Sequence, residues 1–323
     1  MAKPKLAVYW AAACGGCDIA ILDIEEKILA VADFFDVVFW PCAFDFKYAD
    51  VERMEDKSIT LTLFNGAIRS DENFHIAKLL RQKSVVLCAF GSCAADGCIP
   101  GLANFYDLAS IMDYAYIKAP SVDNPDKVMP QTVTKMPEGD ITIPRLWNTV
   151  RTLDQVVDVD YVIPGCPPQS KQIAAVVEAV IDILQNGKPL PPKGTVLGAG
   201  EKTCCDECPR ERNVKKIKSF IRPFQIIPDP NLCLMEQGIV CCGPATRSGC
   251  DAKCVKAGVP CRGCYGMPAN VRDQGAKMVS ALASVIDSQD PEEIEKIIEQ
   301  IPDPLGTFYR FSLPGSLLRR VQA

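Results

Sequence analysis

Short apolar runs alternate with segments of helical period through the first 190 residues of the chain. The runs that predict buried strands lie at residues 5–10, 37–40, 58–66, 85–90 and 161–163. Between them, apolar positions recur at helical spacing, most clearly over 72–83 and 170–187. Near-continuous apolar strands that alternate with helices predict a parallel sheet covered by helices on both faces. We therefore expect an α/β fold with a flavodoxin-like sheet.

Two further helices are predicted from their buried stripes. The stripe that follows the first strand consists of Ile21, Ile24, Ile28 and Val31. The stripe of the helix predicted over 290–301 consists of Ile294, Ile297, Ile298 and Ile301. Asp290 is the expected N-cap of this last helix, Pro291 takes its first position, and Glu293 is expected to complete a capping box.

The pattern is interrupted twice. Residues 110–160 are rich in Pro and Asp and predict a loop with little structure of its own, whose length suits a partner contact. Residues 187–200, "GKPLPPKGTVLGAG", predict a linker. We therefore expect one domain over 1–190 and a second over 191–323, which ends in helices. Within the second, residues 201–270 show no sustained period and are expected to fold around metal.

Composition narrows the class of protein. The 323 residues are 48% hydrophobic, which is enough for a sizeable core, and the net charge of −5 does not suggest nucleic acid or an anionic membrane as a partner. The apolar runs are far shorter than the roughly 20 residues that span a membrane. The start, "MAKPKLAVYW", has no signal-peptide pattern, so we expect a cytoplasmic protein.

Cysteine is the residue that points to chemistry. The chain has seventeen cysteines and one histidine, and ten of the cysteines fall within residues 201–270. In a reducing compartment, cysteines at this density indicate metal rather than disulfides. Because His75 is far from every cysteine group in the sequence, zinc sites of mixed Cys/His type are nearly excluded. All-cysteine zinc sites stay open, and iron–sulfur clusters fit better.

Four cysteines follow predicted strands and are expected to meet. These are Cys14, Cys17, Cys93 and Cys166, the first two forming a C-x-x-C motif. Ligands of a parallel sheet gather at the carboxyl ends of its strands, so three loops that are distant in sequence can place four thiolates around one centre.

The motifs "AAACGGCD", "GSCAADGCIPGL" and "IPGCPP" resemble the small subunit of [NiFe] hydrogenases. The resemblance continues through "CDECPRER", "CLMEQGIVCCGPAT", "PCRGCYGMPANVRDQGAKM" and "GTFYRFSLP", so it covers nearly the whole chain. In detail the sequence is most similar to the cytoplasmic, methyl-viologen-reducing type of methanogens and related anaerobes, which does not use the deazaflavin coenzyme directly. The resemblance implies that the four cysteines above hold a proximal cluster.

Two more clusters are implied by this resemblance, which makes three [4Fe-4S] clusters in all. The implied ligands of the distal cluster are Cys205, Cys208, Cys233 and Cys241, and those of the medial cluster are Cys250, Cys254, Cys261 and Cys264. Taken alone, the medial spacing is also compatible with zinc. Residues 201–222 hold seven basic side chains, Lys215 among them, against four acids. This excess of basic side chains is compatible with three interpretations: stabilisation of anionic clusters, a solvated face, or a docking surface for an acidic partner.

Five cysteines are left without a role: Cys42, Cys88, Cys98, Cys204 and Cys242. Cys88 is expected in the core. Cys204 and Cys242 each stand next to an implied ligand in the sequence. The main alternative to the ligand sets is therefore that one of these two cysteines is the ligand in place of its neighbour. We expect Asp18 to be a solvated carboxylate and His75 to be structural.

The resemblance implies the electron-transfer subunit of a hydrogenase, with hydrogen oxidised on a partner large subunit. The implied route runs through the proximal, medial and distal clusters to an iron–sulfur adaptor and a flavin-containing heterodisulfide reductase. The alternative is a cluster-bearing electron carrier of the same fold that serves a non-hydrogenase oxidoreductase. A quinone-reductase subunit and a zinc-stabilised interaction protein are two further hypotheses.

Overall fold

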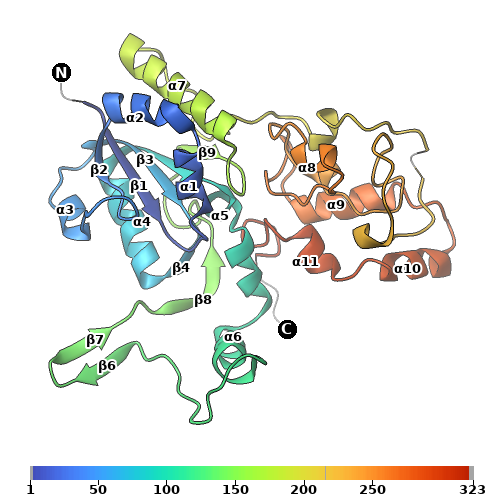
Figure 1. Cartoon of the computed structure of the whole chain (residues 1–323), viewed down its shortest axis with the longest axis horizontal. Helices are drawn as coiled ribbons and strands as arrows, with labels where there is room; N and C mark the ends of the chain where they lie inside the picture. The colour runs from blue at the N-terminus through green and yellow to red at the C-terminus, as the bar shows by residue number, and fades with distance from the viewer. Residues whose placement is uncertain (1–2, 215, 320–323) are drawn as a thin grey trace.

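A five-stranded parallel sheet forms the frame of the first half of the molecule (Figure 1). The computed structural model describes residues 3–214 and 216–319, so Lys215 of the basic run lies outside the described residues. The strands are β1 (Lys5–Trp10), β2 (Asp36–Phe39), β3 (Ile59–Asn65), β5 (Ser84–Phe90) and β9 (Tyr161–Ile163). Their order, β2-β1-β3-β5-β9, with every neighbouring pair parallel, is the flavodoxin-like order expected from the sequence.

Helices cover both faces of this sheet. One face carries α1 (Gly16–Leu22), α2 (Ile28–Phe34) and α7 (Ser170–Asn186), and the other carries α3 (Tyr48–Glu52), α4 (Asp71–Lys83) and α5 (Ser92–Asp96). Successive side chains of a strand point to opposite faces. Accordingly, Leu6 and Val8 of β1 belong to the first layer, whereas Ala7 and Tyr9 belong to the second. The prediction of an α/β sheet covered on both faces is confirmed.

The helix that follows β1 is broken, contrary to the prediction of one continuous helix. A 3-10 turn (Glu25–Lys27) separates α1 from α2, and Glu25 has a φ of 58°. An α-helix cannot pass through a residue in the left-handed region. The predicted stripe still faces the core, because Ile21, Ile24 and Val31 are all buried.

The segment 110–160 has more structure than its composition suggested. Strands β6 (Val133–Met136) and β7 (Gly139–Thr142) form an antiparallel hairpin, and β8 (Leu146–Arg151) pairs with β4 (Ile68–Ser70). The prediction of a largely unstructured loop was therefore wrong, because apolar and polar residues alternate on both sides of a turn that contains Gly139, whose φ is 135°. The hairpin projects away from the sheet (Figure 1), and every residue of β6 and β7 is exposed.

The second half of the chain is mostly irregular, as predicted. Its regular elements are η4 (Cys204–Asp206), η5 (Pro223–Gln225), η6 (Gly243–Ala245), α8 (Lys253–Lys256), α9 (Gln274–Ala283), α10 (Pro291–Glu299) and α11 (Pro304–Phe308). A separate apolar core joins these segments and includes cysteine side chains as well as Leu234, Met278 and Leu313. No helix within the described part of the chain is both long and apolar enough to cross a membrane.

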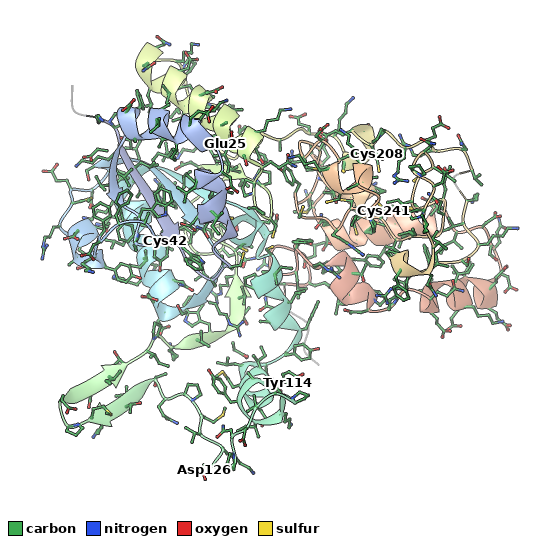
Figure 2. The ribbon with its side chains drawn as sticks, viewed as in Figure 1. Glu25, Cys42, Tyr114, Asp126, Cys208 and Cys241 are labelled. Carbon is green, nitrogen blue, oxygen red and sulfur yellow. The ribbon has the colours of Figure 1, made fainter. Side chains whose placement is uncertain are left out.

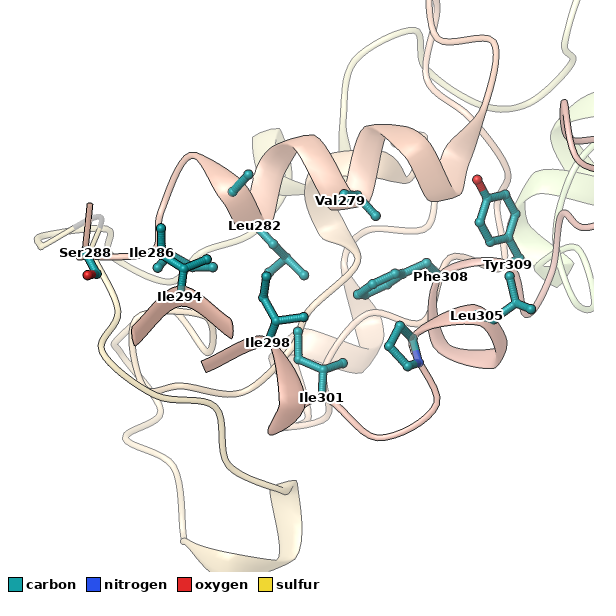
Figure 3. A pocket seen from close by; sticks show the side chains of 12 residues that line it. Val279, Leu282, Ile286, Ser288, Ile294, Ile298, Ile301, Leu305, Phe308 and Tyr309 are labelled. Atoms are coloured by element: carbon teal, nitrogen blue, oxygen red, sulfur yellow. The ribbon is translucent and has the colours of Figure 1, made fainter. Parts of the chain in front are cut away.

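Helix α10 differs from its prediction in two details. Asp290 caps it by accepting a hydrogen bond from the Glu292 N–H, but Glu293 accepts from the Ser288 hydroxyl instead of completing a capping box. Ile298, expected in the buried stripe, is half exposed and lines an apolar cavity of about 440 Å³ between α9, α10 and α11. Figure 3 shows Ile298 facing Leu282 of α9 across this cavity.

Asp160 secures the start of β9, and its removal is expected to destabilise the sheet. Its side chain is 4% exposed and lies 2.6 Å from Arg81 Nη1 and 2.7 Å from Lys193 Nζ, and it accepts from the Leu87 N–H. Burial alone would raise the pKa of Asp160, but the bonds from Lys193 and Arg81 outweigh it and lower the pKa. We expect Asp160→Asn to lower the free energy of unfolding by about 3 kcal/mol at pH 7.

The pH dependence of this effect has a definite sign. Because the folded pKa lies below the unfolded value, the stabilisation is present above about pH 4 and is lost as the pH falls through the folded pKa. All three tryptophans lie in the first 190 residues, so urea unfolding followed by tryptophan fluorescence reports on this part of the chain. Asp158→Asn, at an exposed neighbour, is the control. Equal stability of the two variants would contradict the role of Asp160.

Candidate metal centres

Three loops at the carboxyl ends of β1, β5 and β9 bring four thiols together. Cys14 and Cys17 follow β1, Cys93 follows β5 and Cys166 follows β9. Burial raises the pKa of the Cys17 thiol well above its ordinary value, and the thiols of Cys93, Cys166 and Cys14 raise it further. The four side chains therefore lie within electrostatic range of one another. Thiols gathered in this way repel as thiolates, and positively charged metal relieves that repulsion.

A glycine without a side chain leaves space beside the sulfur atoms of this first group. Gly91 has a φ of 83°, and a Cβ atom added there would lie 2.4 Å from the Cys17 sulfur. The Gly16 N–H donates to the Cys14 sulfur at 3.4 Å, so the tight turn also supplies a backbone hydrogen bond. The sequence between the strands thus leaves room at the sulfur atoms and presents a polar N–H group to one of them.

A second group of thiols lines one small cavity in the other half of the molecule. The cavity is lined by Cys204, Cys205, Cys208, Arg210, Arg212, Cys233, Leu234, Cys241, Gly243 and Val255. Burial raises the pKa of Cys205 to about 12, against the opposing charge of Arg212. A Cβ atom added at Gly243 would lie 3.0 Å from the Cys205 sulfur, so a glycine makes room here as well.

The two adjacent cysteines at 241 and 242 have different surroundings. The Cys241 sulfur lines the cavity of the second group and accepts the Cys261 N–H at 3.3 Å. Cys242 is not among the residues that line this cavity, and its buried thiol faces the charges of Cys261, Arg262 and Arg310. Figure 2 shows Cys241 and Cys208 in the same region, in the half of the molecule that does not contain the sheet.

The third group lies between the other two. It consists of Cys250, Cys254, Cys261 and Cys264. Burial raises the pKa of Cys264 to about 12, and the thiols of Cys261, Cys250, Cys166 and Cys254 raise it further. Cys166 belongs to the first group, so the first and third groups are neighbours.

Hydrogen bonds link the groups in series. The Ser92 hydroxyl, next to Cys93, donates to the Cys264 carbonyl at 2.5 Å, and Gln169 Nε2 donates to the Cys250 carbonyl at 2.8 Å. The Cys261 N–H donates to the Cys241 sulfur, which links the third group to the second. The thiols therefore follow one another from the edge of the sheet into the irregular half.

Two further buried thiols, whose roles the sequence left open, contact these groups. Cys98 is 0% exposed, and its sulfur donates to the Cys166 sulfur at 3.5 Å. That bond lowers the pKa of Cys166 to about 7. Cys204 is also buried, at 2% exposed, and donates toward Cys250 and Cys261, which lowers the pKa of Cys261 to about 6. The only signal for them in the sequence is their place within "GSCAADGC" and "CCDEC".

The Cys98 thiol is expected to tune a cluster rather than hold it. A hydrogen bond to a ligand sulfur favours the reduced, more negative state. We expect Cys98→Ala to keep the iron content and to lower the reduction potential of the cluster nearest β1 by about 40 mV, which corresponds to one hydrogen bond of about 1 kcal/mol. Cys98→Ser should recover part of this shift. Redox titration followed by EPR measures it, and loss of iron in Cys98→Ala would show a ligand instead.

The remaining candidates have structural surroundings. Asp18, expected to be solvated, is buried and accepts from Trp40 Nε1 at 2.8 Å and from Asn65 Nδ2 at 2.5 Å, because the ends of β2 and β3 converge on it. Cys88 is buried within β5, as predicted, whereas Cys42 is exposed. His75 lies on the surface of α4, 3.6 Å from Glu52.

The donor sets fit iron–sulfur clusters. Each of the three groups offers only sulfur, and glycines make room beside the sulfur atoms of two of them. Cysteine thiolates are the usual ligands of [4Fe-4S] clusters. Within residues 3–214 and 216–319, no three His, Cys, Asp or Glu side chains form a group that could hold a single metal ion.

Comparison with known families and proteins agrees with this geometry. The family model of the NADH ubiquinone oxidoreductase 20 Kd subunit matches residues 14–180. The iron–sulfur subunit of an F420-non-reducing hydrogenase from Archaeoglobus profundus is 42% identical over 322 residues, which is 98% of each chain. A subunit of the F420-non-reducing hydrogenase of Methanothermobacter marburgensis is 37% identical over 98% of this chain and 96% of its own.

A solved structure shares the fold. A recombinant [NiFeSe] hydrogenase from Desulfovibrio vulgaris Hildenborough superposes on this chain with a TM-score of 0.51 and 16% sequence identity. The match covers 82% of this chain and 94% of the hydrogenase chain. The similarity therefore extends from the sheet into the cysteine-rich half.

Proposed function

Because the chain belongs to the family of F420-non-reducing hydrogenase iron–sulfur subunits, we propose that it is the electron-transfer subunit of a [NiFe] hydrogenase. It is then one part of an oxidoreductase complex whose hydrogen-splitting site lies on a large subunit. The observation that carries the proposal is the series of three thiol groups, joined through Cys166 and Cys264 and through Cys261 and Cys241. A series of this kind gives electrons a continuous route through the protein.

Twelve cysteines are proposed as cluster ligands. The first group, Cys14, Cys17, Cys93 and Cys166, would hold the proximal [4Fe-4S] cluster; Cys250, Cys254, Cys261 and Cys264 the medial one; and Cys205, Cys208, Cys233 and Cys241 the distal one. We keep the domain boundary between residues 190 and 191 and a cytoplasmic location as parts of the same proposal.

Three features of this chain would support electron transfer through bound clusters: burial of thiols, backbone hydrogen bonds to sulfur, and a nearby guanidinium. Bound iron–sulfur clusters supply one-electron chemistry. The apolar core of the irregular half buries Cys241 and Cys261 and keeps water away from their sulfur atoms. Backbone N–H groups, such as that of Cys261, donate to sulfur and stabilise negative charge there. The guanidinium of Arg212 offsets the charge gathered around Cys205.

The large subunit is proposed to cover the face that contains Cys14. Cys14 is exposed, and Trp10, Ile19 and Leu22 beside it are exposed apolar side chains. This face continues into the β6–β7 hairpin through the Ala12–Ala67 bridge and the β4–β8 pair. An isolated two-stranded hairpin is marginally stable in water, so a partner that covers it would stabilise it.

At the other end, the proposed acceptor is an iron–sulfur adaptor protein that leads to a heterodisulfide reductase. The family model ends at residue 180, before the irregular half, which holds two of the three thiol groups. A function limited to the matched region, such as that of a quinone-reductase subunit, would leave those two groups without a role.

Anaerobic purification of the native complex tests the proposal. We expect a nickel-containing large subunit to co-purify with this chain and the complex to consume hydrogen. A complex that carries the clusters but contains no nickel subunit and takes up no hydrogen would instead indicate an electron carrier for another oxidoreductase. A colourless protein that contains zinc would contradict both.

A further inference from the structure

A basic and apolar surface surrounds the second thiol group, and we propose that it is the docking site for an acidic electron-acceptor protein. This inference rests on the proposed function, which makes the second group the exit of the electron route. The surface consists of the exposed side chains of residues 211–214 and 216–227 and is called the exit surface below. Its basic side chains are Arg212, Lys216, Lys218 and Arg222, and its apolar ones are Val214, Phe224 and Ile227.

Charge is the first observation. Apart from Lys215, which lies outside the described residues, this segment holds four basic residues and one acid, in a chain whose net charge is −5. Lys216, Lys218 and Arg222 are exposed, and among the residues that the structure describes none of them has an ion-pair partner. Basic side chains that form no ion pair attract an acidic partner over long range and speed its encounter.

Exposed apolar side chains are the second observation. Ile227 is 99% exposed, Phe224 is 81% exposed and Val214 is 65% exposed. Single exposed apolar residues are ordinary, but these three fall within fourteen residues and stand among the basic ones. The Arg222 guanidinium lies 5.8 Å from the centre of the Phe224 ring, so charge and apolar surface adjoin. Aromatic and arginine side chains together are typical anchors of protein interfaces.

The exit surface is fixed to the second thiol group. Arg212 is exposed and also lines the cavity of that group. The buried side chain of Arg210 donates to the carbonyls of Asp229 and Leu232, just before Cys233. The loop that carries Phe224 and Ile227 begins after Ile221, whose N–H donates to the Gly238 carbonyl. A partner seated on this loop is therefore held beside Cys233 and Cys241.

The position of the exit surface favours the binding of an electron acceptor over the binding of the hydrogenase large subunit. The exit surface belongs to the irregular half, whereas Cys14 and the β6–β7 hairpin belong to the half that contains the sheet (Figure 1). The large subunit and the acceptor can thus bind to separate surfaces. A membrane with anionic lipids would also attract basic and apolar side chains, but it accepts no electrons, so the position beside the thiols favours a protein.

The test uses the complex of this chain with its large subunit, and a plant-type [2Fe-2S] ferredoxin, an acidic electron-transfer protein, as the probe. The double variant Lys216→Glu/Lys218→Glu is compared with Lys277→Glu/Lys296→Glu, which reverses two exposed charges on α9 and α10. We expect the first variant to weaken ferredoxin binding about tenfold or more at low salt and to reduce the salt dependence, and the control to change it less than twofold. Phe224→Ser/Ile227→Ser should weaken binding with little change in salt dependence.

Electron transfer separates this inference from the proposed function. Methyl viologen is a small dye that needs no protein docking, so its reduction by hydrogen should stay within about twofold of wild type in every variant. A wild-type complex that reduces viologen but does not bind the ferredoxin would overturn the docking site and leave the proposed function intact. Failure of the wild type to reduce viologen would count against the proposed function, while ferredoxin binding would still test the surface.

Two other outcomes would also overturn the inference. Equal ferredoxin affinity in the charge-reversal variant and its control would mean that the exit surface is only a solvated basic face. Binding of the wild-type complex to phosphatidylserine vesicles, lost in the Phe224→Ser/Ile227→Ser variant, would assign the surface to a membrane instead.

Discussion

Replacing Cys241 with alanine is expected to remove one cluster, whereas the same change at Cys242 is expected to leave all clusters in place. Cys241 lines the cavity of the second thiol group, and its sulfur accepts a backbone N–H. Cys242 is buried nearby but is not part of that cavity wall. A cluster that loses one of four thiolate ligands rarely stays intact, so Cys241→Ala should lose about four iron atoms from a total of about twelve.

The two variants form a matched pair because the residues are adjacent and both buried. Iron and acid-labile sulfide are measured for each, together with the EPR spectrum of the reduced protein. Cys205→Ala and Cys204→Ala repeat the comparison at the other adjacent pair of cysteines, in which Cys204 is the expected hydrogen-bond donor. Loss of iron from Cys242→Ala with retention in Cys241→Ala would reverse the ligand assignment by one residue.

Removing the iron with a chelator is expected to unfold residues 201–265 while the sheet persists. Among the residues of this segment that the structure describes, the regular elements are 3-10 turns of three residues and the four-residue helix α8. Four of its cysteines, at 204, 241, 242 and 261, are themselves part of the apolar core. A segment with so little regular structure draws its folding free energy from the metal, as small metal-binding domains do.

Hydrogen exchange measures this effect directly. Peptides from 201–265 should lose protection by about a hundredfold or more after chelation, whereas peptides from β1, β3 and α4 should change little. The sheet has its own apolar layers on both faces and serves as the internal control. Unchanged protection in 201–265 would show that this half folds without metal.

Much of the sheet could be predicted because its signals are local. Apolar strands and amphipathic helices are recognised from residue spacing alone. Because ligands gather at the carboxyl ends of parallel strands, the strand positions then predicted which loops, far apart in sequence, would meet. The break at Glu25 could not be predicted, since it depends on a backbone conformation that no residue type there requires. The hairpin of β6 and β7 was missed because a high content of Pro and Asp concealed the alternation of two short strands.

Contacts between distant segments were the hardest part of the sites to predict. Cys98 reaches Cys166 only because its backbone has a φ of 45° and its N–H donates to the Phe311 carbonyl, far along the chain. Asp18 is buried because Trp40 and Asn65, at the ends of two other strands, donate to it. Spacing along the sequence carries no information on either contact.

The central claim is that this chain carries electrons from hydrogen through three clusters, and hydrogen itself can test it. The complex is purified without oxygen, oxidised, exposed to hydrogen, frozen and examined by EPR. We expect the spectra of reduced [4Fe-4S] clusters to develop under hydrogen, with a contribution from the distal cluster that is absent in Cys241→Ala. Clusters that dithionite reduces but hydrogen does not would contradict the claim.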